Sequence, residues 1–298
     1  MGLLFTPHLL QPDLLKVLNR SENGIETHLR AVENIRAAGF ERFNIDLMYG
    51  FAGQTIESWR ATLAHAIALG PEYITLYRMR YKLTRISHQA PSVTLDLVRP
   101  LAKLAKQMLS DAGYAANPGK TTYSRLPGDP GTSAYLTRRV VEGMPYLGYG
   151  LGAQSFSHTT ISYNDGAAGK NLMPYHRSLA AQRLPLQDLY DLPLRQMMGK
   201  MCAVSFYFGE IDRAAFRAKF GVGLEDAFSE EITFLLERGL MEWTDTKLRL
   251  TPLGAESVNG VIALFFAPSL QAYLLERDPD RAEDMQRSRT QALRVAGM

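Results

Sequence analysis

The sequence predicts an α/β protein in which a parallel sheet built from βαβ units is followed by a smaller α+β module. Three observations support this fold class. The hydrophobic period changes from helix to strand and back within residues 24–112, Gly and Pro become dense between about 115 and 195, and residues 191–266 have the pattern of helix, helix and hairpin. The expected parts are residues 1–115, 116–190, 191–275 and a charged tail, 276–298.

The βαβ part is predicted from five consecutive segments. Helical spacing of Leu29, Val32 and Ile35 predicts a helix over 24–38, and the apolar run at 42–48 predicts a buried strand. Thr55 opens a second helix that closes at residues 70–71, and the segments 73–79 and 93–112 predict a further strand and helix. Helices and strands that alternate through short links indicate a parallel sheet, in which ligands bind at the carboxyl ends of the strands.

The first predicted strand carries an acid. In FNIDLMYGFAGQT, residues 43–55, Asn44, Asp46 and Met48 alternate with apolar residues and therefore point to one face of the sheet. An ionised carboxylate inside a fold costs several kcal/mol unless it is hydrogen-bonded, so a ligand hydroxyl or amine would explain Asp46. A second interpretation, that Asp46 braces a neighbouring turn, is equally compatible with the spacing.

The Gly- and Pro-rich part contains EGMPYLGYGLGAQSF. Its alternating Gly148, Gly150 and Gly152 let the backbone approach another backbone or a flat ligand closely. The spacing is not a dinucleotide fingerprint, because the third glycine of that motif and its strand-turn-helix context are missing. Gln154 and Ser155 are candidates for ligand recognition, and an ordinary tight turn is the alternative.

Residues 191–275 predict a winged-helix-like module with a hairpin of Met241–Trp243 and Lys247–Leu250. The second helix of the module is acidic, with Glu225, Asp226, Glu230 and Glu231, and would repel phosphate, so we expect no nucleic-acid partner. The tail from residue 276 is mostly charged and is assigned no function.

Composition limits the functions further. The formal net charge of +3 is too small to indicate nucleic acid by itself, and no apolar run reaches the roughly 20 residues of a membrane span, so we expect a soluble, cytoplasmic protein without a membrane partner. The single cysteine, Cys202, excludes an internal disulfide and a metal or cluster site of three thiolates from this chain alone.

Several motifs resemble one family. FNIDLMYGFAGQT followed by ESW resembles the "NIDLxxGxPxQT…W" segment of the oxygen-independent coproporphyrinogen oxidase-like (HemN-like) branch of radical SAM enzymes. GLGAQSF is similar to the family's "GLGAHSF", and LTPLGAESVNGVIALFF to its C-terminal domain. The resemblance runs from about residue 12 to 275. Residues 161–193 are closer to the HemN-like methyltransferase and haem-utilisation branch.

The resemblance implies a partial (β/α) barrel that holds a [4Fe-4S] cluster and S-adenosylmethionine, covered by the C-terminal domain. Cleavage of S-adenosylmethionine in the family yields a 5′-deoxyadenosyl radical, which abstracts hydrogen from a substrate such as a porphyrinogen. Asp46 matches the acid that contacts the cofactor's ribose, and Arg20, in LLKVLNR, matches the arginine that pairs with its carboxylate. Gln54 is a further cofactor candidate, and Gly150, Gly152 and Gln154 are expected near the substrate.

Other family features are missing. The CxxxCxxC cluster motif and the GGTP segment do not occur, and the match begins at about the fourth barrel strand, so the sequence predicts an amino-terminally truncated barrel fragment without cluster ligands. We expect it to need a complementing amino-terminal half for oxidoreductase or methyltransferase activity and to be inactive alone. The alternative is a non-catalytic tetrapyrrole- or nucleoside-binding protein, for which His88, His158 and His176 would be candidate haem ligands.

Overall fold

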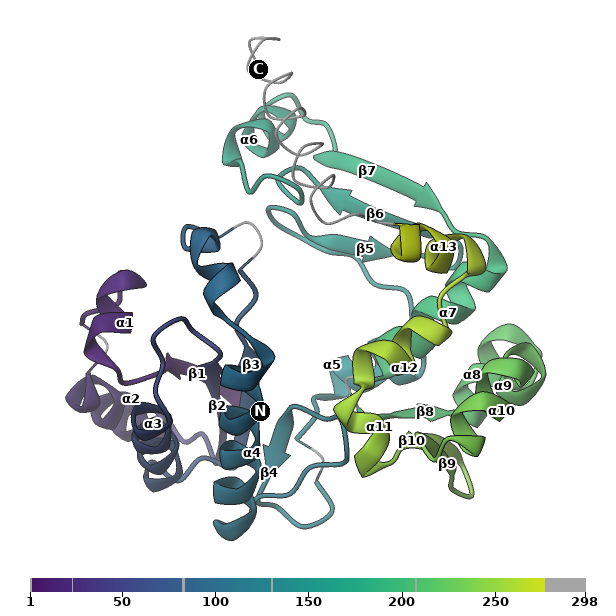
Figure 1. The fold of residues 1–298 in the computed structure, drawn as a ribbon. Helices are drawn as coiled ribbons and strands as arrows, with labels where there is room; N and C mark the ends of the chain where they lie inside the picture. Colours follow the sequence, from purple (N-terminus) through teal and green to yellow (C-terminus); the bar gives the residue numbers. More distant parts are fainter. Residues whose placement is uncertain (1, 23, 82–83, 130, 207, 277–298) are drawn as a thin grey trace. The chain divides into compact units, whose positions relative to one another are not determined.

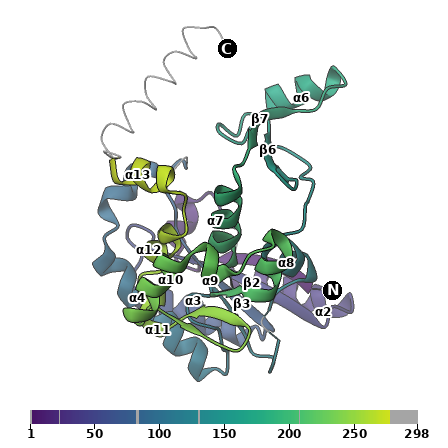
Figure 2. The same ribbon diagram turned by 90° about the vertical axis from the view of Figure 1, so that its right-hand side faces the viewer.

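A computed structural model describes residues 2–22, 24–81, 84–129, 131–206 and 208–276 (Figures 1 and 2). The chain divides into two compact units. Unit 1 consists of Met1–Arg139, Gly166–Leu172 and Tyr207–Gly209, and unit 2 of Val140–Asp165, Met173–Phe206 and Glu210–Met298. The expected charged tail lies outside the described residues from 277 onward. The four-part division of the sequence stays a prediction.

Unit 1 contains a four-stranded sheet in the order β1-β2-β3-β4 (Figure 1). Strands β1, β2 and β3 are parallel, and β4 pairs with β3 in the antiparallel sense. The elements are β1 (Gly2–His8), α1 (Pro12–Val17), α2 (Ile25–Ala37), β2 (Arg42–Tyr49), α3 (Ile56–Ala68), β3 (Tyr73–Arg78), the 3₁₀-helix Ser87–Ser92, α4 (Leu95–Asp111), β4 (Thr122–Ser124) and α5 (Ala134–Leu136).

One face of this sheet forms the apolar core of unit 1. Ile45 and Leu47 of β2 are fully buried against side chains of α3 and α4, among them Trp59. The Trp59 indole donates a hydrogen bond of 3.0 Å to the Leu101 carbonyl, which joins the two helices. Helix α3 begins where the sequence predicts, because the Thr55 hydroxyl accepts from the backbone N–H three residues on, at 3.1 Å. The core fixes β2 in one register, so its alternate residues face away from the helices.

An ionic contact closes the other end of the sheet. The buried Glu72 carboxylate accepts hydrogen bonds of 2.8 Å from both Arg36 and Arg125 and one of 3.0 Å from the Phe43 N–H. Burial opposes ionisation of Glu72, but these three donors outweigh it and hold the pKa of the carboxyl below its usual value. Glu72 therefore ties α2 and the segment after β4 to the amino-terminal end of β2.

Unit 2 contains two antiparallel three-stranded sheets, β5-β6-β7 and β8-β10-β9. Its elements are the π-helical turn Thr137–Val141 at its border, β5 (Gln154–Phe156), β6 (Thr160–Asn164), α6 (Leu172–Ala180), β7 (Leu186–Asp191), α7 (Leu194–Ser205), β8 (Glu210–Asp212), α8 (Arg213–Phe220), α9 (Leu224–Ala227), α10 (Ser229–Glu237), β9 (Met241–Trp243), β10 (Lys247–Leu250), α11 (Pro252–Glu256), α12 (Val258–Leu264) and α13 (Pro268–Glu276).

The core of unit 2 is aromatic. Phe216 of α8, Phe228 and Phe265 are fully buried, and the Phe228 ring lies edge-on to Phe265 with 5.2 Å between the ring centroids. Helices α8 and α10 and the hairpin β9–β10 pack around these rings in the order that the sequence predicts. The fold class is therefore the expected mixed α/β arrangement with a helix, helix, hairpin module after it. No helix among the described residues is both long and apolar enough to cross a membrane.

Candidate functional site

The face of β2 and β3 that points away from the helices is polar. The Asn44 amide donates to the Asp46 carboxylate at 2.7 Å, and the Asn44 oxygen accepts from the Thr75 hydroxyl at 3.0 Å. Thr75 in turn lies 3.1 Å from the Thr122 hydroxyl of β4. The register places Asp46 beside Thr75 and Met48 beside Tyr77. The predicted alternation along β2 is confirmed, and Asp46 belongs to a chain of hydrogen bonds across three strands.

The carboxyl group of Asp46 has a higher pKa than an exposed aspartate. Its side chain is buried, with 8% of the residue exposed, and it faces no basic side chain at ion-pair distance among the described residues. Burial raises the pKa of Asp46 from 3.8 to about 6, and the hydrogen bond from Asn44 opposes this rise only in part. A buried carboxylate with a raised pKa is a candidate binding group.

The turn after β2 is braced by the third cofactor candidate, Gln54. The Gln54 side-chain oxygen accepts from the Gly50 N–H at 2.8 Å and from the Phe51 N–H at 3.4 Å. The Ala52 N–H donates to the Tyr81 hydroxyl at 2.9 Å, which holds the outer side of the same turn. Gln54 is buried, so its oxygen acts in the turn. Contact of its amide with a cofactor stays a prediction.

A pocket of about 410 Å³ lies at the carboxyl ends of β2 and β3. Arg20 and Arg85 line it, together with Asn19 and Thr84, and its apolar wall consists of Val17, Leu18, Met48, Phe51, Met79 and Ile86. Arg20 follows α1 directly, after Asn19 in the left-handed conformation (φ 58°). This turn places an exposed guanidinium beside Met48, which lies two residues beyond Asp46 on the same face of β2. Arg20 thus lines this pocket with Met48, whereas Asp46 lies farther back along β2 and is not one of the lining residues.

Arg85 is not among the site residues predicted from the sequence, and Asn44 was predicted only to share a face of the strand with Asp46. Arg85 donates to the Val17 carbonyl at 3.2 Å, and its position in the pocket depends on the path of the chain after β3, for which the sequence has no signal. Asn44 has a signal, because it lies two residues before Asp46 and must therefore share its face.

The substrate-proximal candidates lie in unit 2. Gln154 is held between two tyrosines, because its side-chain oxygen accepts from the Tyr146 hydroxyl and its amide donates to the Tyr163 hydroxyl at 2.6 Å. Gly150 and Gly152 have positive φ angles of 103° and 65°, and the Gly150 carbonyl accepts from the Asn164 amide at 2.9 Å. These contacts fix the loop. Ligand contact by Gly150, Gly152 and Gln154 stays a prediction.

A close backbone approach, expected from the alternating glycines, occurs at Gly148. A Cβ atom there would lie 2.3 Å from the Gln154 carbonyl oxygen, so no larger residue fits without a shift of the backbone. At Gly150 a Cβ would meet nothing, and the positive φ is what favours glycine.

The chemistry of the chain does not fit an iron–sulfur cluster. Cys202 is the single cysteine of the sequence and is fully buried in the core of unit 2, where burial raises the pKa of its thiol. Within the described residues, no group of three or more His, Cys, Asp and Glu side chains could hold a metal ion. The candidate haem ligands His88, His158 and His176 are all exposed, and their role stays a prediction.

Comparisons with known proteins agree with the fold. Residues 208–256 match the HemN C-terminal domain family. The chain is 27% identical over 263 residues to an oxygen-independent coproporphyrinogen III oxidase of Thermostichus vulcanus, which covers 80% of this chain and 77% of the relative. It is 24% identical over 280 residues to the heme chaperone HemW of Lactococcus lactis, covering 85% of this chain and 65% of that protein.

A solved structure shares the fold as well. Its title is "Coproporphyrinogen III oxidase (HemN) from Escherichia coli is a Radical SAM enzyme", and it superposes with a TM-score of 0.70 at 19% identity over 89% of this chain. The chain is therefore similar to HemN-like proteins in its C-terminal domain, in sequence and in fold. It spans 63% of the solved HemN chain and 65% of the HemW relative. The HemN-like protein thus contains the C-terminal domain of the family and a sheet whose polar face carries Asp46.

Proposed function

We propose that this HemN-like chain contributes part of a binding site for S-adenosylmethionine in a radical SAM enzyme that acts on a porphyrin-related or other aromatic substrate. The observation that carries the proposal is the buried carboxylate of Asp46 on the polar face of a parallel sheet, two residues before Met48, which lines a pocket together with Arg20. Small-molecule sites of α/β sheets lie at this end of the strands.

The donor set suits S-adenosylmethionine. An ionised carboxylate accepts hydrogen bonds from both hydroxyls of a ribose, which is the role we assign to Asp46. A guanidinium pairs with a carboxylate through parallel hydrogen bonds, and Arg20 is exposed at the pocket and available for the carboxylate of the methionine part. The Gln54 amide is assigned a place beside the cofactor, and Gly150, Gly152 and Gln154 a place near the substrate.

The residues of this chain do not fit the [4Fe-4S] cluster, so we derive no radical step from them. S-adenosylmethionine supplies a 5′-deoxyadenosyl radical only when a cluster reduces it, and cluster ligation takes thiolates that this chain lacks. The proposal therefore assigns to this chain the binding and orientation of the cofactor, and it assigns cluster binding to a complementing half.

The buried single cysteine favours one second candidate. A chain without cluster ligands can bind a nucleoside or tetrapyrrole without catalysis, and one of its relatives is named a heme chaperone. With a nucleoside as the ligand, the Asp46 carboxylate still accepts from a ribose, but Arg20 has no carboxylate to pair with.

Titration calorimetry with two ligands tests the proposal. S-adenosylmethionine carries both the ribose and the carboxylate, whereas 5′-methylthioadenosine carries the ribose alone. We expect Asp46→Asn to weaken binding of both ligands about tenfold, because a hydrogen bond to a charged group is worth about 1.5–3 kcal/mol. We expect Arg20→Met to weaken binding of S-adenosylmethionine alone.

Matched controls are exposed residues of the same types. Asp111→Asn at the end of α4 and Arg30→Met on α2 should leave both affinities unchanged. If Asp46→Asn binds S-adenosylmethionine as the wild type does, the assigned site is wrong. If Arg20→Met affects neither ligand while Asp46→Asn affects both, the nucleoside-binding candidate replaces the cofactor site.

A further inference from the structure

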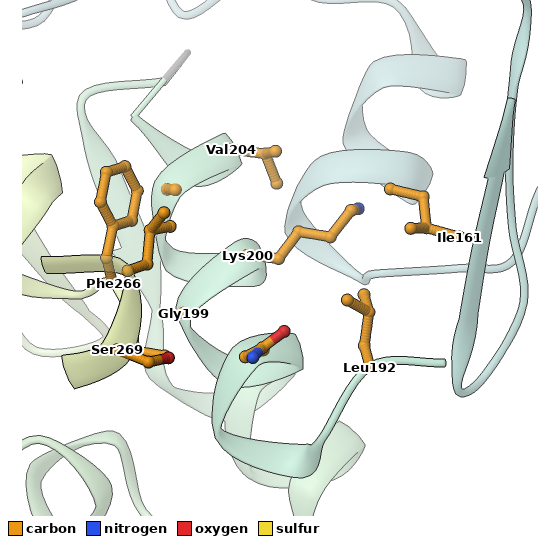
Figure 3. Close-up of a pocket in the computed structure, with 11 residues that line it drawn as sticks. Ile161, Leu192, Gly199, Lys200, Val204, Phe266 and Ser269 are labelled. Carbon is orange, nitrogen blue, oxygen red and sulfur yellow. The ribbon is translucent and has the colours of Figure 1, made fainter. Parts of the chain in front are cut away.

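Unit 2 contains a pocket of its own, about 500 Å³ in volume (Figure 3). It is formed by one face of α7, strand β6, the residue after β7 and the segment that leads into α13. Its lining residues are Ile161, Leu192, Gln196, Gly199, Lys200, Ala203, Val204, Phe266, Ala267, Ser269 and Leu270. A volume of this size is typical of sites for small organic ligands, which occupy roughly 300–1,000 Å³.

A glycine sets one wall of the pocket. A Cβ atom on Gly199 would lie 2.4 Å from the Phe265 carbonyl oxygen, so only glycine lets this segment pass so close to α7. Gly199 and Ala203 are four residues apart and therefore lie on the same face of the helix. Gly199 therefore lets the Phe265 backbone pack against α7, and the next residue, Phe266, lines the pocket (Figure 3).

The chemistry of the lining is mostly aliphatic with one cation. Ile161, Leu192 and Val204 give branched apolar surface, and Phe266 is the one aromatic ring among the described lining residues. Lys200 extends from α7 towards Ile161, with Leu192 below it in the view (Figure 3). Among the described lining residues it is also the one charged side chain. An ammonium next to aliphatic surface is complementary to a carboxylate that carries a hydrocarbon chain.

The position of the ammonium is fixed by a neighbouring ring. Lys200 Nζ lies 3.9 Å from the centroid of the Phe156 ring, in a cation–π contact. Gln196 lies one turn before Lys200 on α7 and adds an amide to the lining, and Ser269 adds a hydroxyl. The pocket thus has one charged group, two neutral polar groups and otherwise apolar walls.

We propose that this pocket binds a small carboxylate with an aliphatic chain, the carboxylate on Lys200 and the chain along Leu192, Val204 and Phe266. The proposal is independent of the cofactor site in unit 1, because every lining residue belongs to unit 2.

Titration calorimetry of the full chain with decanoate tests the proposal, with decanamide as the neutral ligand of equal length. We expect decanoate to bind about tenfold or more tightly than decanamide, the factor of a charge-assisted hydrogen bond. Lys200→Met should remove this preference, and Lys200→Arg should keep it because the charge remains.

Lys219 provides the matched control. Its Nζ lies 5.4 Å from the centroid of the same Phe156 ring and donates to the Gly143 carbonyl at 2.6 Å, but Lys219 does not line the pocket. Lys219→Met should therefore leave the preference for decanoate unchanged. Ala203→Leu should weaken the binding of both ligands, because the larger side chain fills part of the pocket. Thermal unfolding verifies that each variant is folded.

Three results would overturn the proposal. Equal affinity for decanoate and decanamide would remove the role of the charge. An equal loss of the preference for decanoate in Lys200→Met and Lys219→Met would show a general effect of charge. If neither ligand binds to the folded wild type, the proposed site does not exist.

Discussion

Replacement of Asp46 by Asn should stabilise unit 1 at neutral pH. The substitution keeps the side-chain shape and an oxygen that can accept the 2.7 Å hydrogen bond from Asn44, but it removes the buried charge. In the wild type, burial raises the pKa of Asp46 from 3.8 to about 6. The folded chain therefore binds this proton more tightly than the unfolded chain does.

The sign and size follow from this difference in pKa. The stabilisation that comes from protonation is fully present below about pH 3.8 and is lost as the pH rises through about 6. One pKa unit corresponds to about 1.4 kcal/mol, so the ionised carboxylate costs about 2–3 kcal/mol of the free energy of unfolding at about pH 8. We expect Asp46→Asn to recover this amount at pH 8 and to have little effect near pH 4.

Urea unfolding of unit 1 measures the effect. The sequence contains two tryptophans, and Trp243→Phe leaves Trp59, which is buried in the core of unit 1, as the fluorescent reporter. Asp46→Asn and wild type are compared in this background at several pH values. A difference in unfolding free energy that is the same at pH 4 and pH 8, or a destabilised variant at pH 8, would refute the assigned burial and pKa of Asp46.

Four further experiments test other parts of the molecule. Glu72→Gln should lower the free energy of unfolding by about 1–3 kcal/mol near pH 7. The stabilisation by the wild-type carboxylate is fully present above the pKa of an unfolded glutamate and is lost below the lowered pKa of Glu72 in the folded chain. The effect of the substitution should therefore shrink as the pH falls through that lowered pKa. A pH-independent loss would argue against the ion pairs. Cys202 should resist a thiol reagent in the native chain and react with it in urea; rapid labelling of the native chain would contradict the burial of Cys202. Anaerobic reconstitution of the isolated chain should produce no cluster absorbance. Gly254→Ala should destabilise unit 2 by about 1–3 kcal/mol, because its Cβ would lie 1.9 Å from the Leu240 carbonyl oxygen, and unchanged unfolding by circular dichroism would show that the contact relaxes freely.

The sequence predicts the regular part of the fold well, because hydrophobic period and capping residues act locally. The hairpin β9–β10 has the predicted bounds, and α3 begins after Thr55 as predicted. The three strands β5, β6 and β7 were not predicted, and β5 in particular has only three residues and follows a glycine-rich segment. Strand β1 was also not predicted, because its sequence has no alternation of polar and apolar residues and the strand is defined by its pairing with β2.

The candidate site could be predicted in part. The face on which Asp46 lies follows from the two-residue period of a strand, but the pKa rise depends on burial by groups that are distant in sequence. The position of Arg20 beside Met48 depends on a left-handed turn at Asn19 that the sequence signals weakly. The hydrogen bond from the Gly50 N–H to the Gln54 side chain could not be predicted from the sequence, because a glutamine in a turn is compatible with several partners.

Hydrogen–deuterium exchange with and without S-adenosylmethionine reports where on the chain the ligand binds. We expect S-adenosylmethionine to slow exchange in the segment 43–54, which contains Asp46 and the turn after β2, and in the segment 14–20, which ends at Arg20. We expect no change in the hairpin Met241–Leu250. Slower exchange confined to unit 2, with residues 43–54 unaffected, would contradict the assignment of the cofactor site to the polar face of this sheet.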